Sequence, residues 1–122
     1  MDRKSIEAYC LKLAGTTQDY QKDWEADRFF IGTKMYAMIG GDSNGKPILT
    51  LKCDPILSEE LREDNEAVIP GYYMNKKHWN SIYFESNISN ELIEKLIAHS
   101  YNLVLKNLPK KAQKEIGLPF EI

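Results

Sequence analysis

The sequence predicts an α+β domain in which a mainly antiparallel sheet is covered by helices on one side. Two segments, 3–14 and 90–108, carry apolar residues at helical spacing, and a third helix is expected to begin after residue 54. Short apolar runs alternate with clusters of turn-forming residues, which is typical of strands joined by hairpins. In chain order the expected elements are α-β-β-β-β-α-β-α.

Length and composition indicate a single domain. The chain has 122 residues, of which 43% are hydrophobic and 28% charged, so it is long enough to bury a core and too apolar to be disordered. We assign residues 1–117 to the domain and 118–122 to a C-terminal tail. The apolar runs are too short for a membrane span, and no secretory signal follows the first methionine. We therefore expect a cytoplasmic protein without membrane association.

The first half of the chain predicts one helix followed by four strands. Asp2 is the expected N-cap of the helix, and Gly15 is its expected stop. The apolar stripe of this helix consists of Ile6, Tyr9, Cys10 and Leu13. The strands are expected at 16–24, 28–31, 35–39 and 48–53, with a turn at 25–27. The segment 40–47 predicts an exposed hairpin loop, and it lacks the Gly-Lys-Ser/Thr ending of a phosphate-binding loop.

The second half predicts a helix, a strand and a final long helix. Asp54 as N-cap and Pro55 at the first helical position open the second helix. Residues 66–75 are expected to be irregular. The strand 79–84 should place Trp79, Ser81 and Tyr83 on one face and Asn80, Ile82 and Phe84 on the other. Ser89 or its neighbour caps the last helix, and Pro109 either ends that helix or starts a short basic one.

No motif for catalysis or metal binding is evident. Cys10 and Cys53 lie in no Cys-x-x-Cys pair, and both are expected to be small buried hydrophobes. His78 and His99 are far apart and lack the spacing of metal ligands. No nucleophile accompanies either histidine. We therefore expect a protein without metal or cofactor, and not an enzyme.

Charge is unevenly distributed along the chain. The net charge of −2 argues against a strongly basic nucleic-acid-binding domain. Residues 59–66, however, contain five acids and only Arg62 as a cation, whereas 106–114 contain four lysines and no acid. One surface can therefore be basic while another is acidic.

The segment 69–84 is the part of the sequence richest in side chains that can either pack in a core or bind a ligand. Lys76 and Lys77 can neutralise phosphates, Asn75 can donate to a phosphate or a base edge, and His78 or Tyr72 can stack. The alternative is a structural corner, in which Trp79 anchors the core and Asn75 shapes a turn. Two further groups of lysines can either bind a nucleic-acid backbone or simply be solvated surface charges. One group lies near a helix end and consists of Lys106, Lys110, Lys111 and Lys114. The other consists of Lys34 and Lys52 at strand ends.

Four stretches together resemble the MmcQ/YjbR family of small bacterial proteins, a domain of unknown function. They are a glycine-lysine-aromatic-alanine strand entry with Thr33 as an insertion (32–37), a strand-to-helix junction (51–55), a proline-glycine-to-tryptophan signature (69–80) and a final helix (100–104, followed by 108–109). They span roughly residues 6–113. The resemblance implies a fold like that of type III secretion chaperones. It also implies a DNA-binding role, sometimes described as a double-wing arrangement.

Three functions follow as hypotheses. The first is DNA binding without enzymatic activity. Its contact residues are expected to be Lys34, Lys52, Tyr72, Asn75, Lys76, Lys77, His78, Lys106, Lys110 and Lys111. The second is a protein-interaction or chaperone-like module, including a homodimer. The third is a small-molecule binder with a pocket near Tyr72, Lys34 and Trp79.

Overall fold

A computed structural model describes residues 1–72 and 74–116, which form four helices and a six-stranded sheet. In chain order the elements are α1 (Arg3–Lys12), β1 (Thr16–Gln21), β2 (Ala26–Ile31), β3 (Lys34–Gly41), β4 (Pro47–Lys52), α2 (Pro55–Asp64), β5 (Val68–Pro70), β6 (Trp79–Ile82), α3 (Asn90–Lys106) and α4 (Lys110–Ile116). The predicted tail, 118–122, and Gly117 before it lie outside the described residues.

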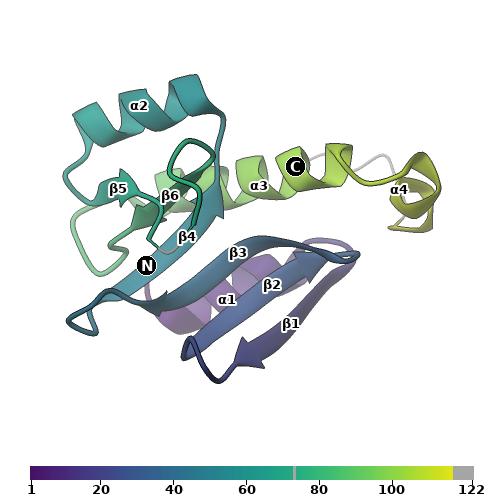
Figure 1. Ribbon diagram of the computed structural model, residues 1–122, viewed down its shortest axis with the longest axis horizontal. Coiled ribbons are helices and arrows are strands. Elements are labelled where there is room, and N and C mark those ends of the chain that lie inside the picture. Colours follow the sequence, from purple (N-terminus) through teal and green to yellow (C-terminus); the bar gives the residue numbers. More distant parts are fainter. Residues whose placement is uncertain (73, 117–122) are drawn as a thin grey trace.

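The sheet has the strand order β1-β2-β3-β4-β6-β5, and every neighbouring pair is antiparallel. Helix α3 packs against β2, β3 and β4, and α1 lies on the same side of the sheet, in contact with β1 and α3 (Figure 1). Leu61 of α2 joins Val68 and Ile82 in the same core, so α2 covers the β5–β6 end of that face. The predicted α+β class, the antiparallel sheet and the element order are confirmed.

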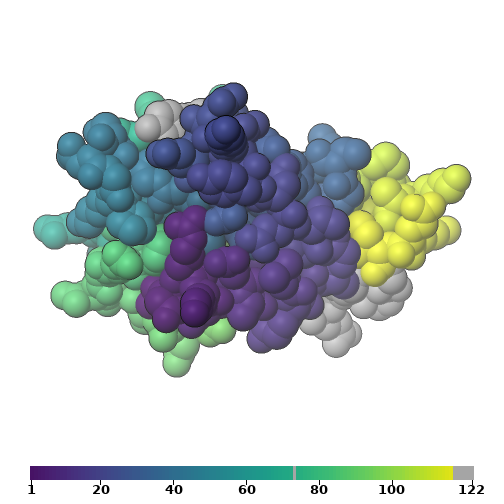
Figure 2. All heavy atoms as spheres, turned by 90° about the horizontal axis from the view of Figure 1, so that it is seen from below, coloured from purple at the N-terminus to yellow at the C-terminus, as the bar shows by residue number. Residues whose placement is uncertain are grey.

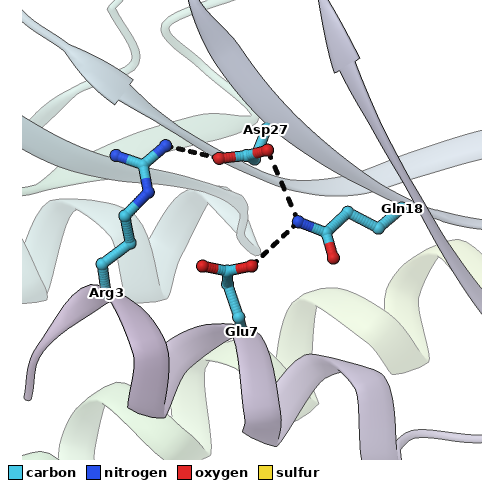
Figure 3. A network of polar contacts seen from close by, with 4 residues as sticks. All are labelled: Arg3, Glu7, Gln18 and Asp27. Atoms are coloured by element: carbon cyan, nitrogen blue, oxygen red, sulfur yellow. Dashed lines mark hydrogen bonds and ion pairs between the residues drawn. The ribbon is translucent and has the colours of Figure 1, made fainter.

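Helix α1 is fixed at its start by a cap and along its length by polar contacts with the sheet. Asp2 accepts a hydrogen bond from the Ser5 backbone N at 2.8 Å, as its N-cap position predicts. Figure 3 shows the network above the helix, with Arg3 reaching Asp27 at 2.5 Å. The Gln18 amide donates both to Glu7 at 3.0 Å and to Asp27 at 3.4 Å. These bonds connect α1 to β1 and β2.

Helix α3 is the central element of the core. Ser89 caps it by accepting from the Leu92 backbone N. The rings of Tyr101 and Tyr36 meet edge to face with centroids 5.3 Å apart. Ser100 is fully buried and donates to the carbonyl of Tyr36, while its hydroxyl oxygen accepts from the backbone N of Lys52. One serine thus connects α3 to two neighbouring strands.

Two predicted boundaries are wrong for reasons of packing. The turn expected at 25–27 lies earlier, because Ala26 is buried and pairs with Gln21 as the first residue of β2. Strand β3 continues through Gly40 and Gly41, which were expected in a loop. A Cβ on Gly40 would lie 3.4 Å from the Ala26 side chain, which is ordinary van der Waals contact between two paired strands.

Strand β5 lies within the segment that was expected to be irregular. It has only three residues and ends at Pro70, so its length and its last residue are not typical of a strand, although Val68 and Ile69 favour strands. Pairing with β6 holds these residues in a strand, with Val68 opposite Ile82.

Candidate nucleic-acid interface

The strand register brings Lys34, Lys52 and Trp79 to the same end of the sheet. Lys34 begins β3 and Lys52 ends β4, and these two strands are antiparallel neighbours. Trp79 begins β6 and lies directly opposite Lys52. The exposed Lys77 and His78 immediately precede it. We call this end of the sheet, together with the helix termini beside it, the basic end.

The C-terminal part of α3 lies at this basic end. Its Ser100 contacts the backbone of Lys52, and Leu108, just beyond the helix, lies 3.5 Å from where a Cβ on Gly32 would be. Gly32 belongs to the turn that leads to Lys34. The lysines that follow are all exposed: Lys106, Lys110, Lys111 and Lys114. The register and the helix packing therefore join lysines from distant parts of the sequence.

The acidic run 59–66 lies farther along α2, although the exposed Asp54 and Glu115 lie close to lysines of the basic end. Helix α2 starts next to the end of β4 and carries its acids from Glu59 onward, as the chain approaches β5. Figure 1 shows α2 at the upper left and α4 at the far right of the molecule. In the described part of the chain, the ion pairs within 4.0 Å involve Arg3 and Arg28, so no lysine of the basic end has a carboxylate partner at that distance.

Gly71 and residues 74–78 form a structural corner. The side-chain oxygen of Asn75 accepts from the backbone N of Lys77 at 2.9 Å and of His78 at 3.3 Å, which forms an Asx-type turn. The Lys76 ammonium donates to the carbonyl of Gly71 at 3.0 Å. Asn75 and Lys76 therefore shape the loop that presents Lys77 and His78.

Tyr72 points away from the basic end. Its hydroxyl accepts from the backbone N of Ser43 at 2.8 Å, in the turn between β3 and β4 at the opposite end of the sheet. Its backbone N donates to Ser81, whose hydroxyl also bonds Thr50. The structure thus separates Tyr72 from Lys34 and Lys52.

Two hollows formed by the described residues lie away from Tyr72, Lys34 and Trp79, around which a pocket was expected. A hollow of about 560 Å³ lies by the β1–β2 and β3–β4 turns, lined by residues such as Trp24 and Asp42. A groove of about 500 Å³ runs along α3 beside Tyr9 and His99. Neither is lined by any of the three residues proposed for the pocket.

Arg62 is a positioning residue that sequence reasoning missed. From α2 its guanidinium donates to the Asn80 side-chain oxygen at 2.7 Å and to the carbonyl of Lys76 at 2.5 Å. It thereby fixes the loop 75–79 against the sheet. The available signal was the single arginine within the acidic segment 59–66. Its partners could not be inferred without knowing how α2 packs.

We expect Arg62→Met to lower the free energy of unfolding by about 2 kcal/mol, because the side-chain oxygen of the buried Asn80 would lose its donor. Urea denaturation measures the change, and hydrogen exchange should show faster exchange in the loop 75–79. The control is Glu63→Gln on the exposed face of the same helix, which should stay within about 0.5 kcal/mol of wild type. Equal stability of the two variants would contradict the role given to Arg62.

The cysteines and His99 are placed for packing. Burial raises the pKa of the Cys10 thiol to about 12, and burial also raises the pKa of Cys53. Both thiols therefore stay protonated at neutral pH and are poor nucleophiles. Burial lowers the pKa of His99, whose Nε2 accepts from the backbone N of Asp54 at 3.2 Å. These three side chains contribute to the core and to the α2 junction.

Residues 1–72 and 74–116 hold neither a cluster of metal ligands nor a membrane-spanning helix. No group of three or more His, Cys, Asp or Glu side chains is arranged to hold a metal ion. No helix in these ranges has the length and apolar character needed to cross a bilayer.

Comparison with known proteins identifies relatives over nearly the whole length. A family model described as YjbR matches residues 11–103. The uncharacterized protein YbdF of Escherichia coli O157:H7 is 37% identical over 120 residues, covering 95% of this chain and 98% of YbdF. The uncharacterized protein YjbR of Escherichia coli K12 is 30% identical over 106 residues, covering 87% of this chain and 89% of YjbR.

A solved structure supports the same relationship. The crystal structure of Deinococcus radiodurans protein DR2400, described as a DUF419 domain, superposes with a TM-score of 0.87 at 32% identity. The match covers 98% of this chain and 90% of that one. The likeness to type III secretion chaperones stays an expectation.

Proposed function

The chain belongs to the YjbR family, and from the arrangement of its lysines we propose that it is a non-enzymatic module that binds the phosphate backbone of DNA at the basic end. The contact residues would be Lys34, Lys52, Lys77, His78, Lys106, Lys110 and Lys111. Tyr72, Asn75 and Lys76 would act indirectly, by holding the loop in place.

One observation carries the proposal: lysines from β3, β4, the loop before β6, and α3 and α4 lie at one end, without carboxylate partners among the described residues. An ammonium group with no ion-pair partner is available to a phosphate. The acids of α2 would face away from the duplex. A modest net negative charge is compatible with DNA binding when lysines gather on one part of the surface.

The test is fluorescence anisotropy with a short labelled DNA duplex. Binding should weaken steeply between about 50 mM and about 200 mM salt, since each neutralised phosphate releases counterions. The triple variant Lys106→Glu, Lys110→Glu, Lys111→Glu should bind roughly 100-fold more weakly at low salt, through lost contacts and added repulsion.

The matched control is Lys4→Glu, Lys22→Glu, Lys46→Glu, which changes the net charge equally. These exposed lysines lie at the start of α1 and in the β1–β2 and β3–β4 turns, at the opposite end of the sheet. The control should bind within a few-fold of wild type. If both triple variants lost DNA affinity equally, the loss would be a general effect of net charge, and the basic end would not be the binding site. Absence of binding at low salt would end the DNA proposal.

A further inference from the structure

The two edges of the sheet differ in how they are protected. Edge strand β5 has three residues, ends in proline and has α2 packed against it. Edge strand β1 has six residues in unbroken register with β2, without a bulge. It contains no proline, lysine or arginine, which are the usual guards of an exposed edge. In the described part of the chain, β1 thus keeps one row of backbone groups without a strand partner.

The side chains of β1 are also accessible. Thr17, Asp19 and Tyr20 are exposed, and Tyr20 keeps 58% of its surface open to solvent. Figure 2 views the molecule from below, where α1 and β1, in purple and violet-blue, form the middle of the surface. Threonine and tyrosine are also residues that favour strands.

We infer that β1 pairs antiparallel with β1 of a second copy of this chain, so that two sheets join across a two-fold axis. An axis perpendicular to the sheet reverses the strand and keeps each face on its own side. Residues opposite each other must then share a face. A register with Gln18 of one copy opposite Gln18 of the other satisfies this rule, and it determines all the other residue pairs between the two strands.

Within β1, this register places no like charges opposite each other. Asp19 is the only charged residue of β1, and here it lies opposite Thr17 of the second copy. Thr16 lies opposite Tyr20 of the second copy, a β-branched and aromatic pair of the kind that stabilises antiparallel strands. Shifting the register so that Asp19 faces Asp19 would place two carboxylates opposite each other. The charge of Asp19 therefore rules out the register centred on Asp19, and the Thr16–Tyr20 pairs favour the one centred on Gln18.

Two contacts already hold the central residues in place. Glu7 and Asp27 accept from the Gln18 amide, so the residue at the proposed axis is fixed before association (Figure 3). The Asp19 carboxylate accepts two hydrogen bonds from Arg28, at 2.8 and 2.6 Å. The Thr17 hydroxyl of the second copy can donate to the same carboxylate. Fixed side chains reduce the entropy lost on association.

The experiment measures self-association by sedimentation equilibrium over the widest concentration range that solubility allows. Wild type should shift from monomer to dimer as concentration rises. Thr17→Asp places a carboxylate opposite Asp19 twice in each dimer and should raise the dimer Kd about tenfold. Thr17→Lys places an ammonium there instead, so it should leave the Kd unchanged or lower it.

The opposite responses of the two variants are specific to this register. A lysine at an open strand edge normally hinders pairing, so a non-specific edge effect would weaken the dimer in both variants. That result would overturn the proposed register, as would a dimer insensitive to both substitutions. A strictly monomeric wild type would overturn the inference as a whole. Thr17 is exposed, and circular dichroism should confirm that both variants keep the wild-type fold.

Discussion

Tyr101→Ala should lower the free energy of unfolding by about 3–5 kcal/mol. Tyr101 is fully buried, and its ring meets that of Tyr36 at 5.3 Å. Its hydroxyl also donates to the carbonyl of Ala14 at 2.5 Å. The substitution removes the ring from the centre of the core and leaves a cavity between α3 and β3. Urea denaturation followed by circular dichroism measures the loss.

Tyr101→Phe separates the ring from the hydroxyl. This variant keeps the packing against Tyr36 and leaves the Ala14 carbonyl without its donor, so it should cost about 1–2 kcal/mol. A loss for Tyr101→Ala no larger than that for Tyr101→Phe would contradict the central position given to the ring.

Gly71→Ala should lower the free energy of unfolding by about 3 kcal/mol through overpacking. A Cβ at this position would lie 2.7 Å from the Cβ of Trp79 and 2.9 Å from its backbone oxygen. The Gly71 backbone N also donates to that oxygen at 2.8 Å. The chain therefore cannot accept a side chain here unless the loop 71–78 moves away from β6. Thermal and urea denaturation, followed by tryptophan fluorescence, measure the effect.

Gly45→Ala is the matched control. Gly45 has a φ of 80°, which alanine adopts with strain, but the space around it is open, with no atom within 4 Å of a Cβ. This variant should cost about 1–2 kcal/mol from backbone strain alone. If Gly71→Ala were no more destabilising than Gly45→Ala, the close approach of Gly71 and Trp79 would be wrong.

The sequence predicted the elements whose ends carry their own signals. The Asp2, Asp54 and Ser89 caps are confirmed, because capping depends on residues within one turn. The faces of β6 are also confirmed, since Ile82 pairs with the core residue Leu49 while Ser81 pairs with Thr50 and bonds its hydroxyl on the other face. Strand β5 was missed because it is short and ends in proline, and pairing with β6 holds it in a strand.

The candidate site was only partly predictable. The lysines near 76 and 110 were identified by composition, but their proximity to Lys34 depends on the sheet register and on how α3 crosses the strands. Tyr72 was grouped with them because it is near Lys76 in sequence, yet its side chain extends toward Ser43. Arg62 was missed because an arginine among acids suggests solvated charge.

The contacts of α3 also determine when the protein can fold during synthesis. Ser100 bonds the Tyr36 carbonyl across 64 residues, and Tyr101 bonds that of Ala14 across 87. The hairpins from β1 to β4 can form as they leave the ribosome, because their contacts are local. Their apolar face, however, stays uncovered until α3 has been translated. The nascent chain therefore passes through a long interval of exposed core, when it is most prone to aggregate and most in need of a chaperone.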